Sequence, residues 1–221
     1  MARFEAYLIS LQNIPERRDT LQAMQEQLPD LHLVDAVDGR RLSREELQAL
    51  TATGFLQPPF VDGCMLTGRK LSLGQLGCFL SHKRVVEQIT QQEKPYALVL
   101  EDDITLVPDF VARVEELIEK IPFPFDILHL HVMDEQRNLL GLQPPLINPT
   151  PPGFWGTQAY LLPKTSASTI LERLSTMRST LDLQLSYAGL RDYFTSLRFV
   201  EEKDIPSYIC GDAKTYISDV I

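Results

Sequence analysis

The sequence has few cysteines and no long apolar segment, and these two absences exclude several classes of protein. Its three cysteines, Cys64, Cys78 and Cys210, include no Cys-x-x-Cys pair. Such an odd and sparse set argues against a disulfide framework and against a structural zinc site. The apolar stretch from Ala6 to Ile9 is far too short for a signal sequence or a transmembrane segment, and no other segment approaches a span. The cytosol is therefore the expected compartment.

The chain also lacks any long basic run, and its 221 residues carry a formal net charge of -9. An acidic protein repels the phosphates of nucleic acid, so nucleic acid is excluded as a partner. General attraction to anionic lipid is not expected either, although a local patch remains able to make peripheral contact with a membrane. The length suits one α/β domain with a sizeable core, so residues 1–221 are predicted to form a single domain.

Strand-like and helix-like segments alternate along the chain, which is typical of an α/β fold with a mostly parallel central sheet. The predicted strands are 4–10, 31–34, 96–100, 126–132 and 157–162. The predicted helices are 13–28, a short one from Ser43, one from Ser72 to Ile89, 111–121 and 165–174. Residues 51–70 are predicted to be an irregular insertion, and 143–156 a proline-rich loop. The wider Pro/Gly-rich segment 134–156 is a candidate lid, and the pattern weakens after Leu183.

An acidic cluster follows the most apolar strand of the sequence. Residues 96–100 read as a buried parallel strand, and Glu101, Asp102 and Asp103 come directly after it. Ligands of open α/β sheets bind beyond the carboxyl ends of strands. Three adjacent carboxylates repel one another, and a divalent cation with oxygen ligands relieves that repulsion. The alternative is a solvated turn that caps the helix near Pro108, and the local pattern does not decide between the two.

Five segments of the sequence, taken together and in this order, form a recognisable pattern. They are Ala6-Tyr-Leu-Ile-Ser-Leu11, Val34-Asp-Ala-Val-Asp-Gly39, Leu73-Gly-Gln-Leu-Gly-Cys-Phe-Leu-Ser-His82, Leu98-Val-Leu-Glu-Asp-Asp103 and Gly156-Thr-Gln-Ala-Tyr160. In this combination the chain resembles glycosyltransferase family 25, which contains bacterial lipo-oligosaccharide galactosyltransferases and is related to collagen galactosyltransferases. The matches cover roughly the first four-fifths of the chain.

The resemblance implies a glycosyltransferase A-type fold, which is a single Rossmann-like domain. It also implies a UDP-sugar donor, an inverting reaction and a divalent metal, with Mn²⁺ first. Carried over by position, Asp103 and Glu101 would ligate the metal, and Asp102 would hydrogen-bond ribose or sugar. Two features depart from the family: Gln75 replaces a usual glutamate, and no histidine follows His131.

Further candidates for donor binding lie near the ends of the first two predicted strands and in the long helix. Ser10 and Arg17 follow the first strand, where an arginine can hold a phosphate or a pyrimidine edge. Asp38 follows the second strand and can accept from ribose or uracil, although Asp-Gly is also a frequent turn pair. Ser81 and His82 enter through the resemblance, since a lone helical histidine is more often structural.

The last candidates lie late in the chain. Trp155 offers a flat face for a sugar, and Gly156 permits close backbone approach or a hinge. The alternative is a rigid proline loop with a packed tryptophan. An inverting transfer needs a general base for the acceptor hydroxyl, and Asp182 is the candidate, with Asp126 and Asp134 as runners-up. A helix-capping aspartate is the plain alternative for Asp182.

The sequence therefore predicts transfer of a hexose, galactose first, from a UDP-sugar to a saccharide acceptor. The family places that acceptor in lipopolysaccharide or lipo-oligosaccharide synthesis, lipid-linked and at the inner face of a bacterial membrane. Two alternatives remain open: a non-catalytic module that binds sugar or nucleotide, and a metal-dependent phosphoesterase that uses the same acidic cluster.

Overall fold

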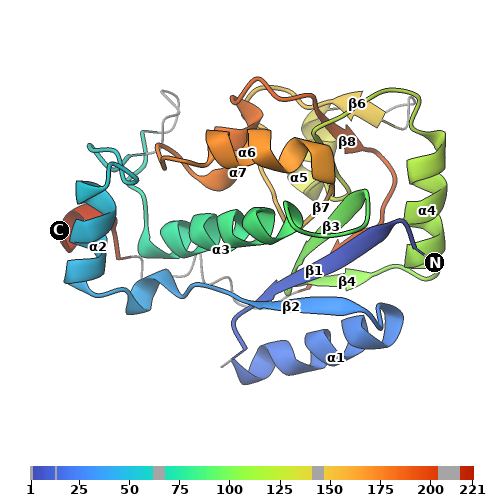
Figure 1. Cartoon of the computed structure of the whole chain (residues 1–221), viewed down its shortest axis with the longest axis horizontal. Coiled ribbons are helices and arrows are strands. Elements are labelled where there is room, and N and C mark those ends of the chain that lie inside the picture. Colours follow the sequence, from blue (N-terminus) through green and yellow to red (C-terminus); the bar gives the residue numbers. More distant parts are fainter. Residues whose placement is uncertain (1, 13, 62–67, 141–146, 204–214) are drawn as a thin grey trace.

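The structure of the chain is a computed structural model that describes residues 2–12, 14–61, 68–140, 147–203 and 215–221. Within these residues, seven strands form one sheet in the order β2-β1-β3-β7-β5-β8-β6. The strands are β1 (Phe4–Ser10), β2 (Leu31–Asp35), β3 (Tyr96–Glu101), β5 (Ile127–His129), β6 (Ile147–Pro149), β7 (Ala159–Pro163) and β8 (Asp192–Thr195). β7 and β6 run opposite to the other five strands, so the sheet is mostly parallel and the predicted α/β fold class is confirmed (Figure 1).

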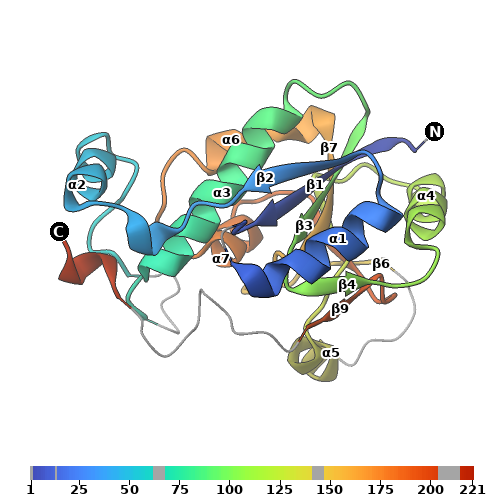
Figure 2. The same cartoon turned by 90° about the horizontal axis from the view of Figure 1, so that it is seen from below.

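Helices cover both faces of this sheet. The helices of the described residues are α1 (Arg18–Gln27), α2 (Arg44–Ala52), α3 (Leu73–Ile89), α4 (Phe110–Lys120), α5 (Asp134–Leu140), α6 (Ala167–Arg173) and α7 (Leu181–Ser186). Alternate residues of a strand point to opposite faces. Thus Tyr7 of β1 packs in a core with α3, α6 and α7, whereas its neighbour Leu8 packs in a second core with α1 and α4. Figure 2 shows α1 and α3 on opposite sides of β1 and β3.

A separate two-stranded ribbon lies next to the acidic cluster. It pairs β4 (Ile104–Leu106) with β9 (Val200–Glu202) in antiparallel register. The main-chain amide of Lys203 donates to the carbonyl of Asp103 at 2.8 Å, which extends the ribbon to the acidic turn. The end of β3 is therefore held by backbone hydrogen bonds from a segment far away in the sequence.

α3 carries two of the predicted site residues, Ser81 and His82, and its start is strongly defined. The Ser72 hydroxyl accepts from the amide of Gln75, while the Gln75 side chain accepts from the amide of Ser72 at 2.8 Å. This reciprocal capping box satisfies amides that a helix start leaves unpaired. The expected capping pattern at Ser72 is confirmed.

Two glycines let α3 approach the loop after β2 very closely. A Cβ atom at Gly77 would lie 2.3 Å from the carbonyl oxygen of Val37, and one at Gly39 would lie 1.8 Å from that of Leu73. No side chain fits at either distance, so both positions require glycine. The contact fixes the distance between the helix and the carboxyl end of β2.

Three predicted segments differ from the structure. The helix predicted over 13–28 begins as a 3-10 turn, Pro15–Arg17, and α1 runs from Arg18 to Gln27; Asn13 lies outside the described residues. The strand predicted over 126–132 is only Ile127–His129, because the chain turns off the sheet before it enters α5. The proline-rich loop 143–156 contains β6, and the segment 134–156 opens with α5, whose first turn holds Asp134 and Glu135.

The region predicted as an irregular insertion, 51–70, begins with the last turn of α2 and then makes isolated bridges from Leu56 to Met177 and from Val61 to Lys70. Residues 62–67 lie outside the described part. Among the described residues, no helix combines the length and apolar character that a membrane span requires.

Candidate active site

A pocket opens at the carboxyl ends of β1, β2 and β3, against the side of α3. Among its lining residues are eight that the sequence singled out, from four separate segments. They are Ser10, Arg17, Asp38, Ser81, His82, Glu101, Asp102 and Asp103. Parallel strands end at the same sheet edge, so residues that follow them in sequence meet there.

Arg17 and Asp102 form a buried ion pair at the base of this pocket. Arg17 Nη1 donates to Asp102 Oδ1 at 2.7 Å, and the two side chains are only 7% and 13% exposed. Burial raises the pKa of Asp102 above its ordinary value, although Ser10 and Arg17 act in the opposite direction. The loop after β1 is thereby tied to the acidic turn after β3.

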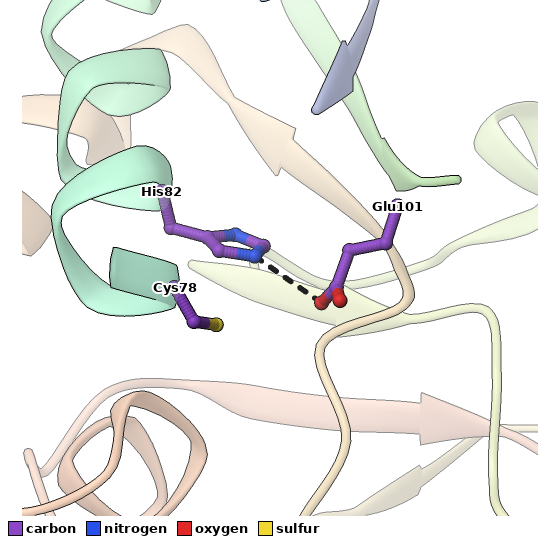
Figure 3. Close-up of side chains that lie close together, drawn as sticks. All are labelled: Cys78, His82 and Glu101. Carbon is purple, nitrogen blue, oxygen red and sulfur yellow. Dashed lines mark hydrogen bonds and ion pairs between the residues drawn. The ribbon is translucent and has the colours of Figure 1, made fainter. Parts of the chain in front are cut away.

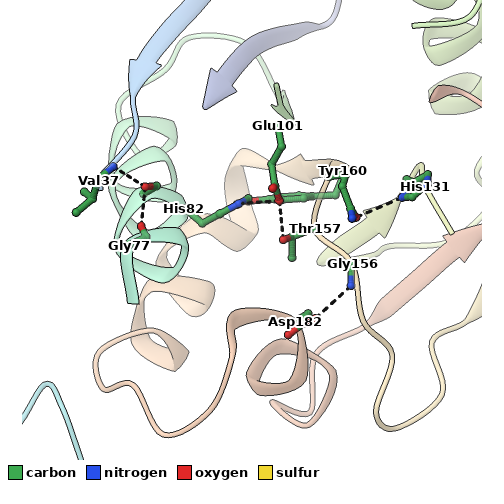
Figure 4. A network of polar contacts seen from close by, with 11 residues as sticks. Val37, Gly77, His82, Glu101, His131, Gly156, Thr157, Tyr160 and Asp182 are labelled. Atoms are coloured by element: carbon green, nitrogen blue, oxygen red, sulfur yellow. Dashed lines mark hydrogen bonds and ion pairs between the residues drawn. The ribbon is translucent and has the colours of Figure 1, made fainter. Parts of the chain in front are cut away.

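Glu101 takes part in a buried polar network with His82 and Thr157 (Figure 4). Its Oε1 accepts from the Thr157 hydroxyl at 2.8 Å and lies 3.2 Å from Nε2 of His82. The other ring nitrogen of His82 lies 3.0 Å from the hydroxyl of Tyr160. Burial opposes ionisation of Glu101, but the hydrogen bonds of His82 and Thr157 outweigh it and lower the pKa of this carboxyl. Burial and the nearby Glu101 carboxylate raise the pKa of Tyr160.

The ionisation of Asp103 is strongly perturbed by its surroundings. Burial, together with the charges of Glu101 and Asp102, raises its pKa to about 7, against the opposing effect of Arg17. Its Oδ1 is buried without a hydrogen-bond partner within the described part of the chain, and the same holds for Oδ2 of Asp102. Buried oxygens without partners are costly, so these two atoms point to a ligand that would satisfy them.

These oxygens provide a test of whether a divalent metal fits the pocket. Hard cations such as Mn²⁺ prefer carboxylate oxygens, and here two unpartnered ones belong to adjacent residues whose negative charges repel. The donor set of Asp103 and Asp102 therefore suits such a cation. Glu101 was also predicted to be a metal ligand, and its carboxylate in the structure faces His82 and Thr157 instead of an open position.

Ser81 and Asp38 line the pocket but are engaged with protein groups. The Ser81 hydroxyl donates to the carbonyl of Gly77 at 2.7 Å and accepts from the amide of Val37 at 2.8 Å (Figure 4). Asp38 accepts two hydrogen bonds from the guanidinium of Arg40, both at 2.8 Å. The hydrogen bond from Arg40, which outweighs the effect of burial, lowers the pKa of Asp38. Both residues thus shape the pocket wall, and their contact with a donor stays a prediction.

Trp155, Gly156 and Asp182 lie on a loop and a helix beside the same network. The amide of Gly156 donates to Oδ2 of Asp182 at 3.3 Å, and Asp182 also accepts from the amide of Leu183 at 2.8 Å. Asp182 lies in the first turn of α7, where a negative charge favours the helix start, and its role as a base stays a prediction. Trp155 is half-buried, and no contact of its ring to the pocket residues is recorded within the described part.

Sequence reasoning missed three residues of this site: Thr157, Tyr160 and Cys78. Thr157 and Tyr160 belong to the segment Gly156–Tyr160, which carried part of the family resemblance. Their contacts with other site residues exist only because β7 pairs with β3. Cys78 lies one turn before His82 on α3, and this spacing was the available signal.

The mostly parallel sheet, with an acidic turn and a buried arginine at its carboxyl edge, defines an α/β protein with a charged pocket at the ends of its strands. The family model described as glycosyltransferase family 25 (LPS biosynthesis protein) matches residues 4–185. The chain belongs to this family, and the resemblance seen in the sequence is confirmed.

Two curated relatives illustrate the range of the family. The cattle (Bos taurus) protein named "Probable inactive glycosyltransferase 25 family member 3" is 32% identical over 174 residues, which cover 76% of this chain and 28% of that protein. Human procollagen galactosyltransferase 2 is 33% identical over 118 residues, covering 53% of this chain and 18% of its own length. The chain therefore spans less than a third of either relative.

Among solved structures, A197 from STIV covers 93% of this chain and 87% of its own, with a TM-score of 0.41 and 9% identity.

Proposed function

We propose that this chain transfers a hexose, galactose first, from a UDP-sugar to a saccharide hydroxyl with inversion at the anomeric carbon. Membership of family 25 supports glycosyl transfer in general, and a relative is named as a procollagen galactosyltransferase. The observation that carries the proposal is Asp103, whose unpartnered buried oxygen and raised pKa of about 7 mark an unsatisfied acidic site in the pocket.

In this proposal the donor diphosphate lies in the pocket beside Arg17, whose charge complements it. Ser10, Asp38, Ser81, His82 and Asp102 line the same pocket, where they contact the nucleotide or the sugar. Asp103 would hold the metal, together with the unpartnered oxygen of the adjacent Asp102. When bound, Mn²⁺ would offset the negative charge that develops on the leaving UDP. Trp155 and Gly156 form the side of the site nearest Asp182, where the sugar is placed.

In this proposal Asp182 is the general base that acts on the acceptor. Its carboxylate takes the proton of the acceptor hydroxyl as that oxygen bonds to the anomeric carbon, and the bond from this carbon to the diphosphate oxygen breaks on the opposite side. The Gly156 amide donates to Asp182 Oδ2, which orients the carboxylate towards the loop that carries Trp155. The acceptor in this proposal is a lipid-linked saccharide of lipopolysaccharide or lipo-oligosaccharide synthesis. The transfer would take place in the cytoplasm, with the protein in peripheral contact with the inner membrane.

A second candidate is a module that binds donor or glycan without turnover. The cattle relative, which carries "inactive" in its name, supports this alternative. A metal-dependent phosphoesterase at the same acidic cluster is the third candidate, and it predicts turnover of phosphate esters without any preference for a sugar donor.

The experiment is slow donor hydrolysis, which needs no known acceptor. The purified protein is incubated with UDP-galactose, UDP-glucose and other nucleotide sugars, with Mn²⁺ or with EDTA, and release of UDP is measured. The test variant is Asp103→Asn. The matched control is Asp109→Asn, an exposed site whose left-handed backbone at φ 56° accepts asparagine readily.

Manganese-dependent release of UDP from one donor, lost in Asp103→Asn and kept in Asp109→Asn, is the expected result and identifies the sugar. Donor binding in calorimetry with no release, with or without a panel of saccharide acceptors, would favour the binding module. Release of phosphate from a simple aryl phosphate, with no donor preference, would favour the phosphoesterase.

A further inference from the structure

Cys78, His82 and Glu101 bring three different metal-ligand types together at one wall of the pocket (Figure 3). Cys78 and His82 are one turn apart on α3, so their side chains share a helix face, and Glu101 approaches from the end of β3. A sulfur, a ring nitrogen and a carboxylate oxygen of these residues all lie within 4.8 Å of one another.

A cysteine beside a histidine also suggests a nucleophile with its general base, but the hydrogen bonds argue against it. Nδ1 of His82 lies 3.0 Å from the Tyr160 hydroxyl, and Nε2 lies 3.2 Å from Glu101. Both ring nitrogens are thus directed at oxygen atoms and neither at the thiol. Burial and the charges of Glu101, Asp182 and Asp103 raise the pKa of Cys78, which keeps the thiol protonated and unreactive without a metal.

We propose that Cys78, His82 and Glu101 form a binding site for Zn²⁺. Zn²⁺ readily accepts thiolate, imidazole and carboxylate in one site, whereas Mn²⁺ and Mg²⁺ prefer oxygen ligands. Zinc bonds of about 2.0–2.3 Å in tetrahedral geometry place ligand atoms roughly 3.3–3.8 Å apart. The present 3.2 Å between His82 and Glu101 already fits, and the Cys78 side chain closes the remaining distance by rotation.

The surroundings of the three side chains match those of a metal site. The Tyr160 hydroxyl oxygen can accept a hydrogen bond from Nδ1–H of His82, which fixes the tautomer that leaves the lone pair of Nε2 for the metal. The Thr157 hydroxyl, 2.8 Å from Glu101 Oε1, orients the carboxylate. All three ligands also line the pocket, so its interior supplies the fourth position to water or to an oxygen of a bound molecule. The thiol proton passes to solvent when the metal–sulfur bond forms.

This zinc site is independent of the proposed glycosyl transfer, because metal binding is measured without substrate. It differs from the oxygen set of Asp103 and Asp102, which suits Mn²⁺, although Glu101 is next to Asp102 in the sequence. The sequence argument against structural zinc rested on the absence of paired cysteines, and it does not extend to one cysteine combined with other ligand types.

The test uses the metal-free chain and Co²⁺ as a coloured substitute for Zn²⁺. One equivalent of Co²⁺ is expected to produce a thiolate-to-cobalt absorption band, and Zn²⁺ is expected to abolish it while Mn²⁺ leaves it intact. In parallel, alkylation followed by mass spectrometry shows which cysteine Zn²⁺ protects. Cys64 and Cys210, which lie outside the described residues, serve as internal controls in the same molecule.

Cys78→Ser is expected to abolish the band, and His82→Gln to weaken Zn²⁺ binding. Tyr160→Phe removes only a hydrogen-bond partner of a ligand, and it is expected to lower the affinity for Zn²⁺ by about 10- to 100-fold. Cys78→Ser and His82→Gln should each lower that affinity further. The wild-type experiments need no variant to fold. A cobalt spectrum without the thiolate band, or zinc protection of Cys64 or Cys210 in place of Cys78, would overturn the proposal. Failed glycosyl transfer with an intact band would leave the zinc site standing.

Discussion

Arg17 and Asp102 lie 85 residues apart in the sequence, yet their charged atoms are 2.7 Å apart and nearly inaccessible to solvent. The pair joins the loop after β1 to the turn after β3, and so it holds together the two strand ends that form the base of the pocket. Because both charges are buried, removing one leaves the other without compensation.

Arg17→Gln is therefore expected to destabilise the protein by about 3–5 kcal/mol, the usual cost of breaking a buried pair. Adding Asp102→Asn should recover part of that loss, because the carboxylate that Arg17 compensated is then removed as well. Urea unfolding of the two single variants and the double variant measures this coupling. Arg198→Gln is the matched control: Arg198 pairs with Asp134 at the surface, where such pairs contribute up to about 1 kcal/mol. Additive losses for Arg17 and Asp102 would show that the pair is not coupled.

The raised pKa of Asp103 predicts a pH dependence of stability in the metal-free protein. Its pKa is about 7 in the folded state, so the folded carboxyl holds a proton that the unfolded one has lost. Stability from this group is complete below about pH 4, the unfolded pKa, and is lost as the pH rises to about 7. Unfolding free energies measured across this range in EDTA should fall less steeply in Asp103→Asn than in wild type. Parallel curves for the two proteins, with Asp109→Asn as control, would contradict the prediction.

Asp182→Asn separates a catalytic role from a structural role. Asparagine keeps one of the two carboxylate oxygens, which can still accept from the Leu183 amide, and it loses only the longer hydrogen bond from the Gly156 amide, so fold and donor binding should persist. Loss of the base is expected to lower the rate of donor hydrolysis by about 10²- to 10⁴-fold. Asp134→Asn is the control, since Asp134 also lies in the first turn of a short helix but is exposed. Equal losses in both variants, or none in either, would contradict a role of Asp182 as the base.

Gly156 adopts a φ of 110°, and a Cβ atom there would lie 2.9 Å from Oε1 of Gln158. Gly156→Ala should cost about 1–3 kcal/mol from backbone strain and should also shift the loop that contacts Asp182. Gly189→Ala separates the two effects, because Gly189 has a φ of 71° with open space around it. Both variants should lose stability in thermal unfolding, but only Gly156→Ala should lower donor hydrolysis beyond its effect on folding. Unchanged hydrolysis in Gly156→Ala would place this loop outside the site.

Gln75 departs from the usual glutamate of the family, and the structure explains why glutamine suffices. Its side-chain oxygen accepts from the Ser72 amide at the start of α3, which a carboxylate would do equally well. Gln75→Glu should therefore be neutral or add up to about 1 kcal/mol through the helix dipole, with donor hydrolysis unchanged. Gln75→Ala should cost about 0.5–1.5 kcal/mol by removing the acceptor. A large gain in the rate of donor hydrolysis with Gln75→Glu would instead show that a carboxylate at position 75 takes part in the reaction.

The elements that the sequence predicted well have local signals. β1 and β3 are short apolar runs, and α3 begins with a capping box at Ser72 that is visible in four residues. The gathering of Ser10, Asp38 and Asp102 at one edge also followed from the sequence, because parallel strands end together.

What the sequence did not predict depends on contacts between distant segments. β7 inserts antiparallel between β3 and β5, and nothing in residues 159–163 specifies those neighbours. That insertion brings Tyr160 to His82 and Thr157 to Glu101, so the polar network was invisible until the pairing was known. The strands after Leu183 are three or four residues long, too short for a periodic pattern to identify.

The approach of α3 to the loop after β2 at Gly39 and Gly77 bears on how such a site is transplanted or redesigned. The positions of Cys78, His82 and Ser81 relative to the strand ends depend on this contact. The main chain of α3 touches the main chain of the loop after β2 with no side chain between them. If only the polar residues were copied into another α/β scaffold, the same side chains would be present. The helix that carries them would then lie too far from the strand ends. A redesigned site therefore needs both glycines, although neither offers a functional group to any ligand.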